Sequence, residues 1–210
     1  MLRLKTLAPF VLIPLIACAS HPREAGMGNG PRGPGPGGGA GGGFAAAASL
    51  GDAGRYGEAL PALRCHAARG DGFEIAQYLA GYSALRQAEA PDTPEILRHE
   101  LRVEGLDRLT RAAEAGWPAA QAELTEALAA IGSEPSLEEA GYWAEVYRHN
   151  RREQVYGLDR LDDRVEAQIA AQLDDETERA LAERAASFTL IPMTRETATP
   201  ECQPYLRENR

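Results

Sequence analysis

The chain has 210 residues and a mass of 22.5 kDa, which allows one modest domain or two small ones. Hydrophobic residues make up 44% of it but aromatic residues only 6%, so the core must be built largely from Ala and Leu. A net charge of −9 argues against binding to nucleic acid or to an anionic membrane surface, and three Cys and four His without paired ligand spacing argue against a zinc module.

The first 17 residues have the pattern of an export signal. Arg3 and Lys5 form a positively charged start, and an apolar stretch follows from Leu7 to Ala17. This stretch of eleven residues is too short for a membrane-spanning helix, which needs about 20. The segment is therefore predicted to direct export and not to span a membrane.

The end of this leader, residues 15–18 (Leu-Ile-Ala-Cys), resembles the lipobox of bacterial lipoproteins. The resemblance implies that residues 1–17 are removed as a lipoprotein signal peptide and that lipid is attached to Cys18. It also implies that Ala19, which stands where Asp would retain the protein in the inner membrane, sends it to the outer membrane, facing the periplasm. The Ala-Cys-Ala triplet around Cys18 equally fits an ordinary signal-peptidase site. Cleavage before Ser20 would give a soluble periplasmic or secreted protein.

Residues 18–43 are predicted to form a disordered tether that begins with the lipidated Cys. Between Gly26 and Gly43, eleven of 18 residues are Gly and three are Pro. Such a stretch has almost no side chains to bury, and it matches neither a collagen repeat nor a phosphate-binding loop. About 25 flexible residues would span roughly 25–30 Å and hold a folded domain clear of a lipid surface.

Residues 44–190 have the sequence of a helical domain. Apolar residues recur at 3.6-residue spacing, and no segment alternates for long enough to predict a strand. Gly and Pro residues mark the helix ends, and Ser136 followed by Glu139 has the spacing of a capping box. The predicted helices cover residues 55–69, 73–88, 94–115, 117–131, 136–149, 156–173 and 174–188.

Two of the predicted helix pairs repeat each other. Leu60 matches Leu106 at a shift of 46 residues, and Ala76 matches Ala120 at a shift of 44. In both pairs a Gly turn separates the helices. Each pair presents Leu residues on one face that it cannot bury alone, so neighbouring pairs are expected to stack.

The turn of the second pair, residues 112–121 (Ala-Ala-Glu-Ala-Gly-Trp-Pro-Ala-Ala-Gln), resembles the Sel-one-like repeat, a relative of the tetratricopeptide repeat. Residues 55–82 resemble the same pattern, and residues 137–144 resemble the first helix of a further repeat. The resemblance implies an all-α fold: a short α-solenoid of antiparallel helix pairs, with the helices of residues 156–188 as C-terminal caps. A plain helical bundle is the alternative. The family also implies an adaptor role without catalysis.

Cys65 and Cys202 are the only Cys residues that follow Cys18. Because export would bring them into an oxidising compartment, we predict that they form a disulfide. The bond would hold the C-terminal tail, residues 191–210, on the first helix pair. The alternative is a buried thiol at Cys65 and a free one at Cys202.

No catalytic or metal-binding pattern is present in the sequence. The His residues are isolated, without partners at metal-ligand spacing, and nothing distinguishes two acids among the 31 Asp and Glu residues as a catalytic pair. We therefore predict that the protein is not an enzyme and uses no cofactor or metal.

Partner binding is predicted where aromatic and Arg residues gather on the helices, because this composition is typical of interface hot spots. Trp117 and Trp143 are expected to pack between helix pairs instead. The residues predicted to contact a partner are Tyr82, Tyr147, Arg148, Arg151 and Arg152.

The sequence thus predicts a non-catalytic periplasmic adaptor or scaffold, tethered to the outer membrane by lipid. It would bind a protein or peptide partner of the cell envelope on a helical-repeat surface and touch the membrane only through the lipid. Two alternatives stay open: an accessory of a cell-wall or polysaccharide hydrolase, and a structural spacer of the envelope without a partner.

Overall fold

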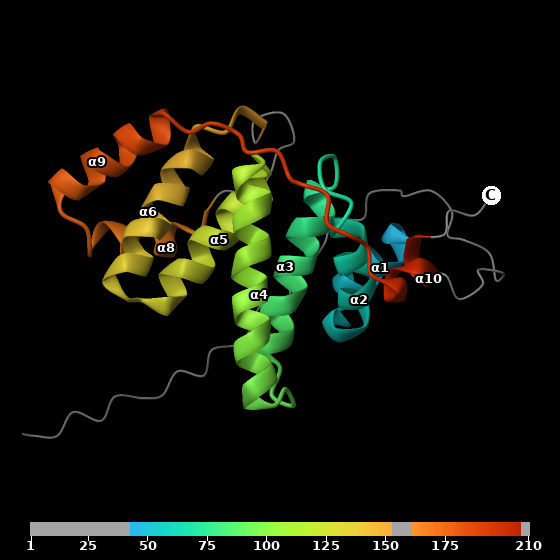
Figure 1. Cartoon of the computed structure of the whole chain (residues 1–210). Coiled ribbons are helices and arrows are strands. Elements are labelled where there is room, and N and C mark those ends of the chain that lie inside the picture. The colour runs from blue at the N-terminus through green and yellow to red at the C-terminus, as the bar shows by residue number, and fades with distance from the viewer. Residues whose placement is uncertain (1–42, 153–160, 207–210) are drawn as a thin grey trace, which may run out of the picture. The chain divides into compact units, whose positions relative to one another are not determined.

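The computed structural model describes residues 43–152 and 161–206, which belong to one of the two compact units of the chain, residues 38–210. The predicted leader, Cys18 and nearly all of the tether lie outside the described residues. The described part is built from helices and contains no strand, which confirms the all-α prediction for it (Figure 1). No helix in this part is long and apolar enough to cross a membrane.

Helices that follow one another in the chain pack against one another. α1 (Phe44–Asp52) packs on α2 (Tyr56–Ala67), α2 on α3 (Glu74–Glu89), α3 on α4 (Glu95–Glu114), α4 on α5 (Pro118–Ile131) and α5 on α6 (Glu134–Arg148). α8 (Asp163–Ala170) and α9 (Asp175–Ala186) cover α6, the position expected of capping helices. The chain then returns to α2 and ends its described part in η1 (Pro200–Cys202) and α10 (Gln203–Leu206) (Figure 1).

Small residues let α3 and α4 approach closely. A Cβ on Gly81 of α3 would lie 2.9 Å from the carbonyl oxygen of Gly105 on α4, closer than real Cβ contacts. The face of α3 that packs inward is lined by Ala residues one turn apart. Four of them are fully buried: Ala76, Ala80, Ala84 and Ala88. The core is therefore Ala-rich, as the composition predicts.

The Gln residues of the two Ala-Gln motifs have the same role in both helix pairs. Gln77 and Gln121 are buried, and each uses its Oε1 atom to accept a hydrogen bond from a residue further along the chain. The donor to Gln77 is Arg108 Nη1 at 3.0 Å, and the donor to Gln121 is Asn150 Nδ2 at 2.8 Å. Each buried amide thus ties its own helix pair to the next element.

The start of α6 differs from the prediction. The helix begins at Glu134, Ser133 is the residue that precedes it, and Pro135 lies in the first turn. Pro suits this position because its nitrogen would have no helical partner there. Ser136 is therefore inside the helix and is not its N-cap; its hydroxyl lies 2.5 Å from that of Ser133.

Two further helices depart from the sequence prediction. α1 was not predicted, because its run of Ala residues shows no apolar periodicity. The helix predicted over residues 156–173 is described only from residue 161, and there it begins at Asp163, with Asp162 as N-cap. Leu161 and Ile169 are buried in one cluster with residues of α5 and α6.

The predicted cysteine pair lies at bonding distance. Cys65 on α2 and Cys202 in η1 have their sulfur atoms 2.09 Å apart and their Cα atoms 5.2 Å apart. Both residues are buried. The C-terminal segment is thereby joined to the first helix pair, as the sequence predicts.

Candidate functional site

The residues predicted to contact a partner do not form one surface. Tyr82 lies on α3, and Arg148 lies at the end of α6 under α8. Tyr147 is in the core. Arg151 and Arg152 follow α6 and line a different pocket from that of Arg148. The residues predicted to contact a partner therefore lie in different parts of the fold.

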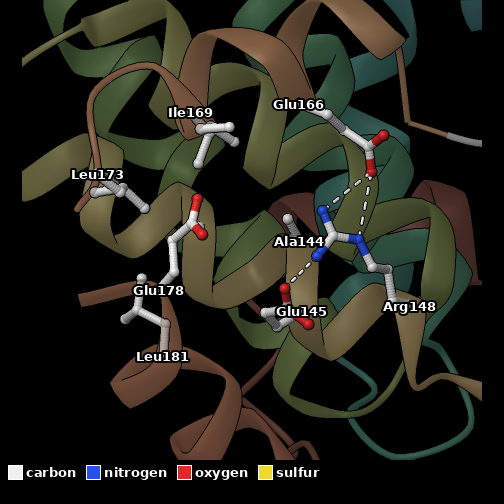
Figure 2. A pocket seen from close by; sticks show the side chains of 10 residues that line it. Ala144, Glu145, Arg148, Glu166, Ile169, Leu173, Glu178 and Leu181 are labelled. Carbon is white, nitrogen blue, oxygen red and sulfur yellow. Dashed lines mark hydrogen bonds and ion pairs between the residues drawn. The ribbon is translucent and has the colours of Figure 1, made fainter. Parts of the chain in front are cut away.

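Arg148 forms ion pairs with residues of its own chain. It lines a pocket of about 240 Å³ between α6, α8 and α9, and Figure 2 shows its guanidinium group between two carboxylates. Nη2 of Arg148 lies 3.2 Å from Oε1 of Glu166, and Nη1 pairs with Glu145. The pair with Glu166 joins α6 to α8, whereas Glu145 lies on α6 itself. Apolar side chains form the opposite wall: Ile169, Leu173 and Leu181.

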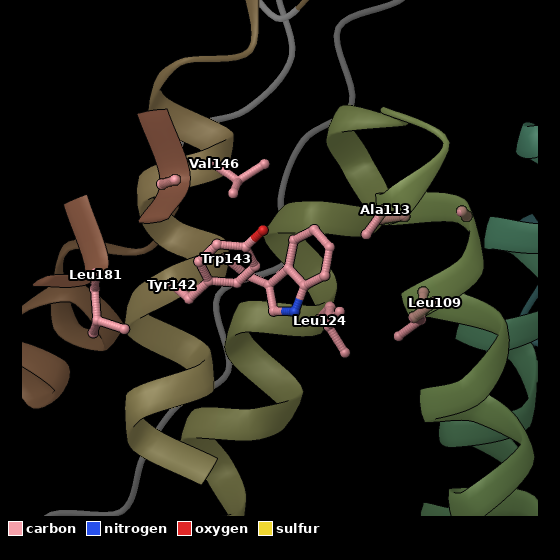
Figure 3. Packing of buried hydrophobic residues seen from close by; sticks show 10 residues of the cluster. Leu109, Ala113, Leu124, Tyr142, Trp143, Val146 and Leu181 are labelled. Atoms are coloured by element: carbon pink, nitrogen blue, oxygen red, sulfur yellow. The ribbon is translucent and has the colours of Figure 1, made fainter. Parts of the chain in front are cut away.

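The aromatic residues of α6 belong to the core. Trp143 is only 3% exposed and packs with Tyr142 among side chains of α4, α5 and α9, which confirms the expected packing of Trp143 (Figure 3). Tyr147 is also 3% exposed and packs with Ala140 and Ala144. Tyr147, which was predicted to contact a partner, therefore lies in the core of the described structure and not on its surface, because it continues the apolar stripe of α6.

Tyr82 belongs to an aromatic cluster that is half-buried. Its ring centre lies 5.9 Å from that of Tyr56 and 6.1 Å from that of Tyr78, and the guanidinium carbon of Arg86 lies 4.8 Å from its ring centre. Arg86 in turn forms an ion pair with Glu123 of α5 at 3.1 Å. Burial, which outweighs the charge of Arg86, raises the pKa of Glu123 to about 7. The cluster thus connects α2, α3 and α5.

Arg151 and Arg152 line the pocket that we take as the candidate functional site, called here the cationic pocket. It has a volume of about 530 Å³ and lies between the start of α5, the end of α6 and the chain that follows α9. Its polar lining consists of Gln121, His149, Asn150, Arg151 and Arg152. Its apolar lining consists of Val146, Ala185, Ala186, Phe188 and Leu190, with Gly116 at the turn.

Hydrogen bonds of Asn150 order the floor of the cationic pocket. Its Nδ2 atom donates to Gln121 at 2.8 Å and to the carbonyl of Gly116 at 3.2 Å, and its Oδ1 atom accepts from the backbone N–H of Arg152 at 3.0 Å. Nη1 of Arg152 reaches the same Gly116 carbonyl at 3.5 Å. Through Asn150, the buried Gln121 thereby positions the segment after α6 that carries Arg151 and Arg152.

The charge of this pocket is opposite to that of the whole chain. The net charge of the protein is −9, yet none of the described lining residues is an Asp or Glu. Within the described part of the chain, neither Arg151 nor Arg152 forms an ion pair with a carboxylate. Two guanidinium groups beside an apolar wall suit a ligand that offers a carboxylate next to an apolar group.

The described lining of the cationic pocket has few side chains of the kinds used in catalysis. It contains no Ser, Cys, Asp or Glu, although it includes His149. Among residues 43–152 and 161–206, no group of three His, Cys, Asp or Glu side chains is placed to hold a metal ion.

Sequence reasoning found the cations of this pocket but missed its walls. Phe188 and Leu190 come from beyond α9, and Gly116 comes from the turn before α5. Only Gln121 carried a signal, because it belongs to a repeated Ala-Gln pair. The rest depends on how distant parts of the chain fold together.

Comparison with known proteins found no match to a protein-family model, to a curated protein or to a solved structure. The function is therefore inferred from the sequence and from the geometry of the cationic pocket.

Proposed function

We propose that the protein is a non-catalytic periplasmic adaptor that is tethered to the outer membrane by lipid on Cys18. Its cationic pocket binds an acidic segment of a protein or peptide partner of the cell envelope. The partner places a carboxylate against Arg151 and Arg152 and an apolar side chain against Phe188 and Leu190. The single observation that carries this proposal is a pocket whose described lining has no Asp or Glu but includes Arg151 and Arg152, neither of which forms an ion pair among the described residues, in a chain of net charge −9.

The proposal includes the finer architecture. The helix pairs α2–α3 and α4–α5 are successive Sel-one-like, tetratricopeptide-like units of a short α-solenoid, with α8 and α9 as its cap. Support comes from the sequence shift of 44–46 residues and from the matching roles of Gln77 and Gln121. Gly70 and Gly116 also have matching φ angles of 81° and 82° at equivalent turns. Proteins of this architecture present extended surfaces to partners.

Reversing the charge of the pocket tests the proposal. The variant Arg151→Glu/Arg152→Glu is crosslinked in cells, and the proteins that co-purify with it are compared with those of the wild type. We expect loss of an acidic partner, with binding weakened at least tenfold, because two charge-assisted contacts become repulsive. The melting temperature should stay unchanged, because both side chains are exposed.

The matched control is Arg102→Glu/Arg179→Glu, which makes the same change in net charge at exposed positions away from the pocket. This variant should retain the partner. Loss of the partner in both variants would show that only the overall charge matters and would contradict the proposed site. Absence of any co-purifying protein from the wild type would favour the envelope spacer, and hydrolytic activity in the captured complex would favour the hydrolase accessory.

A further inference from the structure

The chain that follows α9 runs across the ends of α4 and α3 towards α2 (Figure 1), and we call residues 188–199 the strap. The backbone N–H of Ile191 donates to the carbonyl of Glu114 at 2.9 Å, and that of Glu196 donates to the carbonyl of Ala68 at 2.8 Å. Glu114 and Ala68 are 46 residues apart, the shift at which the helix pairs repeat. The strap thus bonds to equivalent carbonyls of both pairs.

The Gly turns of the two helix pairs make room for the strap. A Cβ on Gly70 would lie 2.6 Å from the backbone nitrogen of Arg195, and a Cβ on Gly116 would lie 2.4 Å from Cδ2 of Leu190. Gly70 and Gly116 are also 46 residues apart. The two equivalent turns therefore supply both the carbonyls that accept the hydrogen bonds and the space that the strap occupies. We call the surface formed by Ala68, Gly70, Glu114 and Gly116 the turn edge.

Other glycines show that this space is not a general property of the turns. Gly72 and Gly132 have positive φ angles of 84° and 72°, like Gly70 and Gly116. A Cβ on either of them would meet nothing within 4 Å. A positive φ alone explains Gly72 and Gly132, whereas Gly70 and Gly116 also lie directly beneath another chain segment.

Apart from Phe188, which packs against Trp143 in the core, the strap is held mainly by its main chain. Leu190 is 57% exposed and Ile191 is 54% exposed. An extended segment that is recognised through its backbone can be replaced by another segment of different sequence, as in peptide binding at sheet edges. The turn edge therefore has the character of a surface for extended peptides.

The disulfide keeps the strap in place. Cys202 follows the strap directly and is bonded to Cys65 on α2, and Arg111 of α4 adds an exposed ion pair to Glu196. A segment held at both ends has a high effective concentration at its own surface, so it excludes a free peptide from that surface. Without the bond, the segment after the strap would keep only the packing of η1 and α10 on α2, where Tyr205 lies against an apolar cluster.

We propose that the turn edge is a second binding surface, for an extended peptide segment of a protein partner, and that the strap occupies it until the Cys65–Cys202 bond is reduced. The reductant is an external dithiol. It transfers two electrons and two protons, so that the two cysteines become thiols while the dithiol becomes a disulfide. No other bond changes. The surface adjoins the cationic pocket, since Gly116 of the turn edge and Phe188 and Leu190 of the strap also line that pocket.

A labelled synthetic peptide with the sequence of residues 187–199 tests whether the surface exists. Its binding to the purified mature protein is measured by fluorescence anisotropy, before and after reduction with a phosphine, and with the variant Cys202→Ser. We expect binding at least tenfold tighter to the reduced protein and to Cys202→Ser than to the oxidised protein. A peptide that is N-methylated at the positions of Ile191 and Glu196 should not bind. Equal binding to the oxidised and reduced proteins, or none to either, would overturn the proposal.

Hydrogen exchange measures the release of the strap without any ligand. On reduction, the backbone N–H groups of Ile191 and Glu196 should exchange at least tenfold faster, while the helical circular dichroism stays unchanged. Unaltered exchange would show that the disulfide does not hold the strap on the turn edge. Because neither experiment uses the partner of the cationic pocket, their failure is separate from failure of the proposed function.

Two Ala substitutions test whether the turn edge is shaped for a chain. Gly70→Ala and Gly72→Ala impose the same cost of a positive φ angle, but only Gly70→Ala places a methyl group against the backbone of the strap. We expect exchange at Glu196 to rise at least fivefold more in Gly70→Ala than in Gly72→Ala. Equal rises in the two variants would contradict this role of the turn edge.

Discussion

His66 is the buried residue of the first helix pair whose polar atoms are least satisfied. It is 6% exposed, its ring centre lies 5.6 Å from that of Phe44, and neither ring nitrogen has a hydrogen-bond partner in the described structure. Burial, helped by the charge of Arg69, lowers the pKa of His66 below its ordinary value of 6.5. His66 is therefore a neutral core residue whose ring nitrogens are buried without hydrogen-bond partners.

We predict that His66→Leu raises the free energy of unfolding by about 1 kcal/mol at pH 7.5, because it removes unpaired polar atoms from the core. The gain should grow as the pH falls through 6.5, since the unfolded wild type then binds a proton that the folded wild type resists. Urea unfolding of both proteins between pH 7.5 and pH 5.5 measures this. Glu123 shifts stability in the opposite direction over part of this range, so the difference between the proteins is the quantity to compare. A pH-independent difference would contradict the assignment.

The two outcomes for α6 residues show how far single positions can be predicted. Tyr147 follows Leu137, Ala140 and Ala144 at helical spacing, a pattern that indicates a buried face but that the prediction of a partner contact did not use. Arg151 could be recognised as a candidate contact because Arg residues follow aromatic residues closely here, a composition typical of interface hot spots. Its pocket could not be predicted, because Phe188 and Leu190 reach it only through the fold.

At the scale of helices, α3 and α4 cross at close range. Gly81 and Gly105 face each other there, and Leu109 lies beside them. The helices can come this close only because neither Gly carries a side chain. The sequence predicts such close packing from its Ala content, but which Gly residues meet depends on the angle between the helices.

We predict that Gly81→Ala lowers the free energy of unfolding by about 1–3 kcal/mol, because the added Cβ would lie 2.9 Å from a backbone oxygen that cannot move freely. Gly57→Ala on α2 is the matched control. There the Cβ meets only the flexible end of Gln87, so the variant should be neutral or more stable by about 0.4–1 kcal/mol. Thermal and urea unfolding compare the two variants. A stable Gly81→Ala protein would mean that α3 and α4 separate easily.

Over the whole molecule, the order of the helices follows from local patterns, and the path of the tail does not. Helix formers, Gly turns and the repeated Ala-Gln pairs predict α2 to α6 with small errors at their ends. The strap has no periodicity, and its partners at Ala68 and Glu114 are far away in the sequence. The cysteine pair alone indicated where the tail goes.

We predict that the mature protein begins at Cys18 and carries lipid there. Mass spectrometry of protein extracted from membranes should find an acylated N-terminal Cys, and Cys18→Ser should move the protein into the soluble fraction. Cys18 precedes the described residues, so this substitution should leave the melting temperature of the helical domain unchanged. An unmodified N-terminus at Ser20 would disprove the lipid tether.

The bond between Cys65 and Cys202 closes 137 residues of sequence separation into a covalent ring. A mechanical pull between the residues before α1 and those after α10 would pass along α1 and part of α2 and then cross directly to the end of the chain. The helices from α3 to α9 would carry no load. While the bond is intact, a stretched molecule can lengthen only outside this ring, and the fold within it is shielded from tension.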